Sequence, residues 1–427
     1  MAQKLTKIIG ITFLVQIGVF GLGLLNNVLL SRWLGPANLG IIALFFLFTE
    51  AIHKVTNLGI ETANLYYISN QKFPRKKLIG TNFINGLLTL CLGSGLIILF
   101  IQTHGLTLFF EPQEATILAR GAYWSILLLF AYMTFDYGTK MLLGHQQFYR
   151  YNKIMLARPV LFFILLSASY FQNKLDVAHV LAIYSISWLL PGFYMWWQQI
   201  PFPLVWDREI TFASVRYGTK IMLSNLLTFL NYRVDIFLVG YFLTKEMVGW
   251  YYVALIVSEK LLYLTQSTST IFFPAASQST QQQSKTPIIS RTNLMLVALG
   301  SLVLGILAPW GLPLVFSDKY LNSVPPLLWL LPGVVALTLP KVLSADFYAR
   351  GRPELSLYTG LVNFVLNVIL NIFLIPRWGI VGAAISSSVG YLVAAALMAF
   401  YYRNMTGVPF REFIIPKAGD WERLKEI

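Results

Sequence analysis

The fold is decided by residues 214–270, which read SVRYGTKIMLSNLLTFLNYRVDIFLVGYFLTKEMVGWYYVALIVSEKLLYLTQSTST. This segment contains two apolar runs, and each run is long enough to cross a lipid bilayer as a helix. A tight turn over residues 243–248 joins the two runs. The segment therefore predicts two consecutive transmembrane helices.

Polar residues interrupt both runs at helical spacing. Steps of 4, 4, 4, 3 and 4 residues separate six of them in the first run, and similar steps separate four in the second. Such steps place each set on one face of a helix. The sets are Arg216, Lys220, Ser224, Thr228, Asn231 and Asp235, and then Glu259, Tyr263, Gln266 and Thr270. Because a charge at membrane depth costs about 2.5–3.5 kcal/mol, we expect both faces to line a wet cavity or to contact a partner.

An earlier part of the chain repeats this pattern. Residues 34–50 align with residues 243–259 without a gap, at an offset of 209. A second match, between FDYGTK and ADFYAR, follows at an offset of 210. The matched pairs include Gly40 with Gly249, Glu50 with Glu259, and Asp136 with Asp346. Several matches in order at nearly constant offset predict a duplicated half.

Composition identifies the class of protein. Of 427 residues, 56% are hydrophobic and 12% are charged, which is typical of a polytopic membrane protein. We predict an all-α fold of about twelve transmembrane helices in two six-helix lobes. An even number of helices per lobe makes the repeat parallel, with a pseudo-two-fold axis along the membrane normal. The predicted spans are 8–30, 38–68, 78–102, 115–140, 152–171, 177–198, 211–242, 247–273, 290–316, 324–347, 355–375 and 379–402. The predicted domains are a lobe of residues 1–198, a cytoplasmic linker of residues 199–210, a lobe of residues 211–403 and a cytoplasmic tail of residues 404–427.

The distribution of Lys and Arg predicts the orientation. With a cytoplasmic N-terminus, the inner segments hold nineteen of these residues and the outer loops hold five. Positive residues concentrate on the cytoplasmic side of membrane proteins. We therefore expect both termini in the cytoplasm of a multi-pass protein of the cytoplasmic (inner) membrane. The net charge of +14 is then explained without a nucleic-acid partner.

The second predicted span carries its own polar face. Its members follow at steps of 4, 3, 4 and 3 residues and are Glu50, Lys54, Asn57, Glu61 and Asn64. Glu50 and Lys54 are one turn apart, so an ion pair between them would make insertion tolerable. A transport role is compatible with that pair. His53 lies off this face and is interpreted as a packing residue.

The sequence contains no enzyme signature. The HExxH, P-loop and GxSxG motifs are absent, and the single cysteine, Cys91, excludes thiolate metal clusters. No cofactor or metal is expected. Without an ATP site, a transporter must draw on ion gradients, the membrane potential or the substrate gradient.

Cations slightly outnumber anions within the spans, which favours an anionic headgroup such as a phosphate or pyrophosphate. The candidate headgroup residues are Lys54, Arg216, Lys220, Arg233 and Lys260, and the candidate cavity lining is Asn57, Ser224, Thr228, Asn231, Gln266 and Thr270. Candidates for ion coupling are Glu259, Glu50, Glu61, Asp235 and Asp136. Glu259 is the first choice as proton carrier, because the adjacent Lys260 points about 100° away on a helix and cannot pair with it easily.

The duplicated halves, LGPANLG and LTKEMVG, VDIFLVGYFL and RWGIVGAAISSSVGY resemble the polysaccharide transporter family. This family of Wzx-type oligosaccharide flippases belongs to the superfamily of the lipid II flippases and MATE exporters. The resemblance implies two lobes around a central cavity that alternate between inward-open and outward-open states. It also implies outward movement of an undecaprenyl-pyrophosphate-linked oligosaccharide for cell-surface polysaccharides such as lipopolysaccharide O-antigen, with other assembly proteins as partners. A MATE-like exporter of another substrate, or a membrane-bound glycosyltransferase or ligase, remains an alternative.

Overall fold

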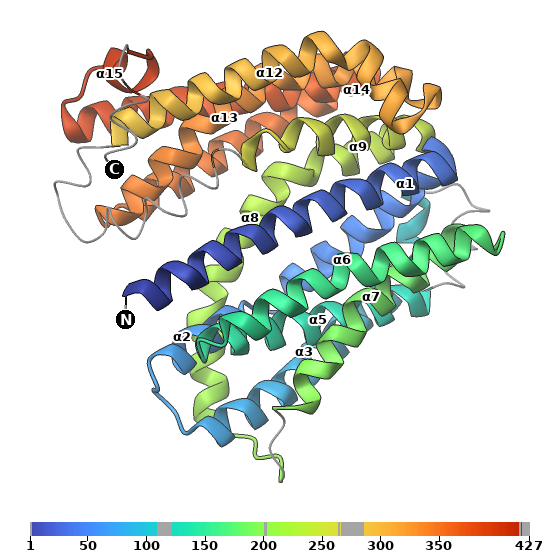
Figure 1. Ribbon diagram of the computed structural model, residues 1–427, viewed down its shortest axis with the longest axis vertical. Helices are drawn as coiled ribbons and strands as arrows, with labels where there is room; N and C mark the ends of the chain where they lie inside the picture. The colour runs from blue at the N-terminus through green and yellow to red at the C-terminus, as the bar shows by residue number, and fades with distance from the viewer. Residues whose placement is uncertain are drawn as a thin grey trace. The chain divides into compact units, whose positions relative to one another are not determined.

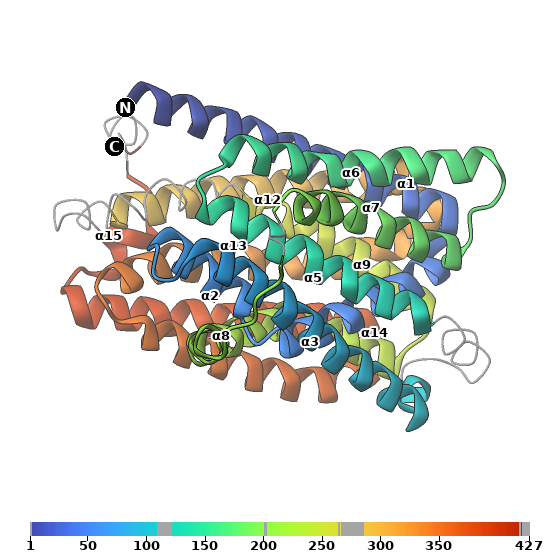
Figure 2. The same ribbon diagram turned by 90° about the horizontal axis from the view of Figure 1, so that it is seen from below.

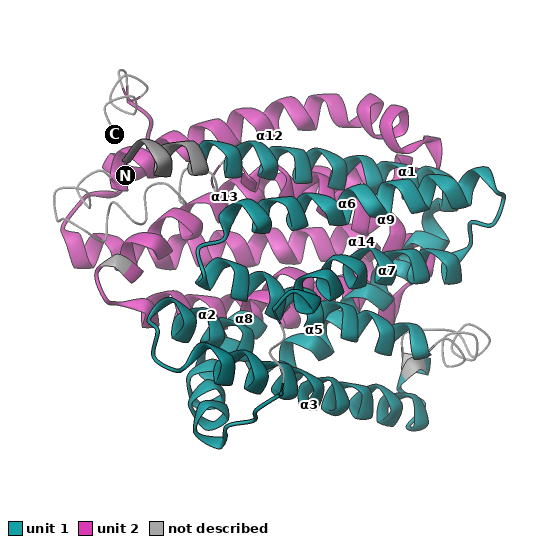
Figure 3. Ribbon diagram, turned by 60° about the horizontal axis from the view of Figure 1, so that its bottom comes forward, with its two compact units in different colours: residues 1–226 teal, residues 227–427 magenta. Residues whose placement is uncertain are grey.

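The computed structural model describes residues 2–108, 122–199, 203–263, 265, 286–417 and 420. Every regular element among these residues is a helix (Figure 1). This confirms the predicted all-α fold. The structure divides into two compact units, residues 1–226 and 227–427, coloured teal and magenta in Figure 3.

The first unit begins with a helix of 55 residues. Helix α1 changes direction at Gly35, which adopts φ 76° and ψ 172° and precedes Pro36, so this one helix contains the first predicted span and most of the second. Helix α6 packs beside α1, where the Asn26 side chain donates to the Pro159 carbonyl at 2.9 Å (Figure 2). The elements of this unit are α1 (Ala2–Thr56), α2 (Ile60–Ser69), α3 (Arg75–Gln102), η1 (Gly105–Leu108), α5 (Ala122–Gly144), α6 (Phe148–Phe171), α7 (Val177–Trp197) and the first half of α8 (Arg208–Phe242).

The second unit is built around α13, which packs against α9, α12 and α14. Helix α14 has 54 residues and changes direction at Gly379, where φ is 58° and ψ is −140°, so it contains the last two predicted spans. The remaining elements are the second half of α8, α9 (Lys245–Glu259), α12 (Thr286–Phe316), η2 (Asp318–Ser323), α13 (Val324–Ala349), α14 (Pro353–Thr406) and α15 (Phe410–Ile414).

Nine helices of the described residues are long and apolar enough to cross a membrane. Helix α14 contains two predicted spans, α1 contains the first and most of the second, and α9 contains the first half of the eighth. Each of the twelve predicted ranges therefore overlaps a described helix, as expected of a polytopic membrane protein.

The predicted linker packs closely against the first unit. The Thr81 hydroxyl of α3 accepts from the Asp207 amide at 3.0 Å, and the Trp206 indole donates to Asn85 at 3.3 Å. Asp207 then caps α8, and the amide of Ile210 holds the pKa of its carboxyl below the usual value. The boundary between the compact units lies inside α8, at Leu226–Leu227, and not in residues 199–210.

The second predicted span is broken. Helix α1 ends at Thr56, α2 begins at Ile60, and the residues between them include Leu58 and Gly59 with φ of 53° and 66°. A Cβ atom on Gly59 would lie 2.2 Å from the Gly218 carbonyl oxygen of α8. The backbone of the α1–α2 break therefore packs directly against the backbone of α8 within the first unit.

Candidate functional site

A charged cluster lies at the junction of α8, α9 and α13 in the second unit. The Arg233 guanidinium binds Glu259 in a fork, with Nη1 to Oε1 at 2.7 Å and Nη2 to Oε2 at 3.1 Å. The exposed fractions of the two side chains are 26% and 22%, so this pair is only partly hydrated. Forked pairs of this kind are stronger and more directional than single hydrogen bonds.

Two lysines lie near the Arg233–Glu259 pair. Lys260 Nζ lies 5.3 Å from the centroid of the Tyr263 ring, and Lys341 Nζ lies 5.7 Å from that of Tyr232. Both ammonium groups are within electrostatic range of Glu259. Among the described residues, this cluster thus holds three cations against one carboxylate.

Glu259 has a cation partner, although the spacing along its own helix predicts none, because Lys260 points elsewhere on that helix. The partner is instead Arg233, on the neighbouring helix. Helical spacing reveals neighbours along one helix only, so it could not find this pair.

Lys341 belongs to the cluster but is not among the headgroup residues predicted from the sequence. It lies in α13, between Pro340 and Val342, in a span whose only other charged residue is Asp346. A lysine in such a span was the available signal, because a charge at membrane depth is costly unless it faces water or a partner.

Asp235 is the centre of a second hydrogen-bond network in the same unit, and all of its hydrogen-bond donors there are uncharged groups. It is 1% exposed and accepts hydrogen bonds from Tyr251 at 2.6 Å, Ser387 at 3.0 Å and the Ile236 amide at 2.8 Å. Asn367 extends the network by donating to Ser387 at 3.2 Å. None of the ion pairs in the described ranges includes Asp235.

The side chains on the polar face of α8 change from exposed to buried along the helix. Arg216, Lys220, Ser224 and Thr228 are exposed, whereas Asp235 is buried. Asn231, a candidate for the cavity lining, is half-buried and bonded to α14: it accepts from Asn363 at 2.7 Å and donates to the Gly360 carbonyl at 3.1 Å.

Arg216 and Lys220 lie on the side of α8 that faces away from the α1–α2 break. Gly218, which touches the break, is two residues from each of them, or about 200° around the helix. Both cations are exposed, and no ion pair in the described part of the chain includes Lys220.

The first unit pairs different residues from those expected. Glu50 and Lys54 are half-buried and form no ion pair with each other in the described structure. Instead His53, which was interpreted as a packing residue, is 4% exposed and bonds Asp136 with Nε2 to Oδ2 at 3.0 Å. Lys54 and Lys140 lie within electrostatic range of the same carboxylate.

The remaining candidates divide into two groups. Asn57 and Glu61 are buried in the first unit. Gln266 and Thr270 lie outside the described residues. The structure therefore brings Arg233, Lys260 and Glu259 together in the second unit, while Arg216 and Lys220 are exposed on α8 and Lys54 is half-buried in α1.

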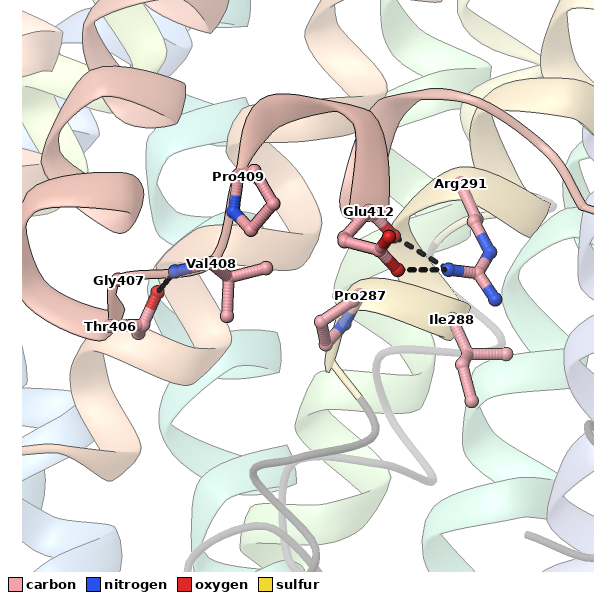
Figure 4. A pocket seen from close by; sticks show the side chains of 8 residues that line it. All are labelled: Pro287, Ile288, Arg291, Thr406, Gly407, Val408, Pro409 and Glu412. Atoms are coloured by element: carbon pink, nitrogen blue, oxygen red, sulfur yellow. Dashed lines mark hydrogen bonds and ion pairs between the residues drawn. The ribbon is translucent and has the colours of Figure 1, made fainter.

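A pocket of about 510 Å³ lies at the other end of the second unit, between the start of α12 and the segment after α14 (Figure 4). Its Arg291 donates to the Glu412 carbonyl at 2.6 Å and forms an ion pair with Asp420. Lys417 hydrogen-bonds Glu412 and lowers the pKa of that carboxyl. The arginine anchors the C-terminal segment, so we do not assign it to the substrate.

Two compact helical units with ion-paired charges inside long apolar helices are typical of a polytopic membrane transporter. Residues 5–280 match the family described as polysaccharide biosynthesis protein, and residues 160–418 match the family described as lipid II flippase MurJ. The chain belongs to the polysaccharide biosynthesis protein family. This confirms the resemblance seen in the sequence, and the matched families are transporter families and not enzyme families.

Two relatives share a segment with this chain. The "probable low-salt glycan biosynthesis flippase Agl15" of Haloferax volcanii is 30% identical over 190 residues, which are 42% of this chain and 39% of that protein. The "uncharacterized membrane protein MJ1068" of Methanocaldococcus jannaschii is 24% identical over 197 residues, 44% of this chain and 39% of that protein. The matched segments thus span about 39% of each relative.

Solved structures share the fold along most of the chain. The lipid II flippase MurJ in an inward closed conformation superposes with a TM-score of 0.75 and 16% identity, covering 94% of this chain and 89% of that one. An inward-facing MATE multidrug transporter gives 0.77 and 16%, covering 90% and 93%. At this identity the likeness shows the fold alone.

Proposed function

We propose that this chain is a flippase that moves a polyprenyl-pyrophosphate-linked oligosaccharide from the cytoplasmic to the outer leaflet by alternating access. The observation that carries the proposal is the cluster of Arg233, Lys260 and Lys341 around a single carboxylate. A pyrophosphate is a multivalent anion, and a guanidinium binds its oxygens in a fork while lysines act as point charges. Family membership supports the same substrate class.

Exposed cations of the first unit fit an approach path for the headgroup. Arg216 and Lys220 follow one exposed face of α8, and Lys54 is half-buried in α1. In this proposal the headgroup contacts Arg216 and Lys220 before it reaches Arg233, which lies further along the same helix. The sugar then contacts Ser224 and Thr228, which lie on the exposed face of α8.

Coupling to an ion follows from competition for Arg233. An incoming pyrophosphate and Glu259 both bind the same guanidinium, so substrate binding releases Glu259. A carboxylate that loses its cation at membrane depth is stabilised by taking up a proton. Asp235, held only by neutral donors, is the second coupling candidate, and Glu50, Glu61 and Asp136 are the others in the first unit.

The proposed direction requires a defined topology. In a Cys91→Ser background, which removes the single cysteine, new cysteines at Lys76 and Lys417 should react with an impermeant thiol reagent only after permeabilisation. Cysteines at Lys174 and Lys319 should react in intact cells, because the outer loops are poor in positive charge. Labelling of position 76 or 417 in intact cells would contradict the topology.

The headgroup site is tested with Lys341. Proteoliposomes holding a labelled polyprenyl-pyrophosphate oligosaccharide report flipping as access of an impermeant lectin to the sugar. Lys341→Ala should lower the initial rate about tenfold or more, since a charge-assisted contact is worth about 1.5–3 kcal/mol. Lys341→Arg should retain most of the rate, because it keeps the charge.

Lys319→Ala is the matched control, as this exposed lysine precedes α13 outside the cluster. Equal rates for Lys341→Ala and Lys319→Ala would remove Lys341 from the site. Absence of any flipping by the parent protein, with substrate present and protein folded, would reject the proposed substrate class.

A further inference from the structure

Six exposed cations lie at one end of the first unit. They occupy the loop between α2 and α3 and the first two turns of α3, α6 and α8, and these three helices begin at the same end of the unit (Figure 1, Figure 2). The six residues are Lys72, Arg75, Lys76, Arg150, Lys153 and Arg208. The distribution of Lys and Arg along the chain predicts that this end is cytoplasmic.

Contacts between the elements join the three helix starts into one surface. Lys77 Nζ lies 3.5 Å from Asp207 Oδ2, so the start of α3 is next to the start of α8. Arg75 is within electrostatic range of His145, which lies in the turn between α5 and α6. The start of α6 follows that turn directly.

The six cations lack acidic partners. Each of them is absent from every ion pair in the described ranges, and the only carboxylates of residues 69–81, 144–155 and 203–212 are Asp207 and Glu209. In the second unit, four cations that are predicted to be cytoplasmic have carboxylate partners. These pairs are Arg291–Asp420, Arg350–Asp346, Arg352–Glu354 and Lys417–Glu412. The first unit therefore carries a positive surface that its own residues do not neutralise.

The cations also lie where a helix disfavours them. The first turn of a helix carries a partial positive charge, which attracts anions and repels cations. Helix α3 nevertheless begins with Arg-Lys-Lys at residues 75–77, and the first turns of α3 and α6 contain no acidic residue. An anion bound from outside would relieve this repulsion.

Exposed aromatic side chains accompany the cations. Tyr149, Trp206 and Phe212 are 65%, 48% and 69% exposed. Lys153 Nζ lies 4.7 Å from the centroid of the Tyr149 ring, and the Arg208 guanidinium lies 6.0 Å from that of Phe212. Aromatic rings and cations at the ends of apolar spans are typical of the interface between lipid and water. The cations therefore lie at the level of the lipid headgroups.

We propose that this surface binds anionic phospholipids of the cytoplasmic leaflet. Clusters of Lys and Arg beside transmembrane helices attract anionic headgroups, and a guanidinium binds phosphate oxygens in a fork. The exposed rings favour a lipid over a soluble acidic partner, because a soluble partner would contact the cations and leave the rings in water. Binding does not depend on the flipped substrate, so it is measured without that substrate.

Thermal unfolding of the purified full-length protein in a neutral detergent tests the surface. Phosphatidylglycerol should raise the melting temperature more than an equal amount of phosphatidylcholine, because a ligand bound only by the native state stabilises it. Added salt should reduce the difference, since the cations are exposed. The triple variant Lys72→Gln/Lys76→Gln/Arg150→Gln should lower the apparent affinity for phosphatidylglycerol about a hundredfold, as each cation contributes a factor of about five.

The triple variant Lys174→Gln/Lys319→Gln/Arg377→Gln is the matched control. It removes the same charge from three exposed cations of the predicted outer loops, and it should bind phosphatidylglycerol like the parent. Both triple variants should elute as monodisperse protein, because all six substitutions are at exposed positions outside the ion pairs of the described structure.

Two results would show that the protein responds only to net charge or to lipid in general: equal loss of affinity in the two triple variants, or equal stabilisation by the two phospholipids. Either result would reject the surface. Soluble glycerol phosphate that stabilised the protein as well as phosphatidylglycerol would assign the cations to free phosphate. Poly-glutamate that bound with the affinity of phosphatidylglycerol would assign them to an acidic protein, and both of these results would reject the lipid.

Discussion

Gly218→Val is expected to leave almost no folded protein, and Gly218→Ala to lower the melting temperature clearly. A Cβ atom at position 218 would lie 2.4 Å from the Leu58 carbonyl oxygen and 2.7 Å from the Gly59 carbonyl carbon. Both obstacles are backbone atoms, so no side-chain rotation relieves the clash. We expect a cost of about 3 kcal/mol for alanine, at the upper end of the range for overpacking.

Gly95→Ala is the matched control. Gly95 lies in the middle of α3, and a Cβ atom there would meet nothing within 4 Å. Alanine at this position should leave stability unchanged or raise it slightly, because glycine is the poorer helix former. If Gly218→Ala and Gly95→Ala had the same melting temperature, the backbone contact between α8 and the α1–α2 break would be rejected.

The helices themselves could be predicted because their cause is local. A run of about 20 apolar residues must satisfy its backbone hydrogen bonds internally when it lies in lipid, so it forms a helix wherever it occurs. Gly35, where α1 changes direction, lies between two predicted spans, and Gly379, where α14 changes direction, is the first residue of the last predicted span.

The partners of the charged residues could not be predicted, because they lie on other helices. His53 and Asp136 are 83 residues apart, and Asp235 and Ser387 are 152 apart. Spacing places a residue on a face, but the packing of the helices decides which faces meet. The Glu50–Lys54 pair, which the spacing allows, is absent from the described structure, while the Arg233–Glu259 pair between two helices is present.

The break at residues 57–59 was missed for a different reason. Asn57, Leu58 and Gly59 lie inside a predicted span, 38–68, whose apolar and polar residues keep helical spacing across the break. The break is compensated by the contact with Gly218, which is distant in sequence. A single glycine is common within transmembrane helices, so it was too weak a signal by itself.

Arg233→Ala is expected to reduce flipping about a hundredfold, the largest loss we predict for any charged residue. The substitution removes a forked contact worth about 3 kcal/mol to the bound pyrophosphate. It also leaves Glu259 partly buried without its guanidinium, so the amount of folded protein should fall as well. The initial rate of lectin access, divided by the amount of monodisperse protein, separates the two effects.

The double variant Arg233→Ala/Glu259→Gln decides between a substrate role and a structural ion pair. Removing both charges leaves no unpaired carboxylate, so the folded amount should recover while flipping stays low, because the guanidinium is still missing. Glu259→Gln alone should keep flipping but lose its response to an imposed pH gradient, since glutamine cannot release a proton. Recovery of the flipping rate in the double variant would show that Arg233 only neutralises Glu259. The headgroup would then have to be bound by Lys260, Lys341 and the exposed cations of α8.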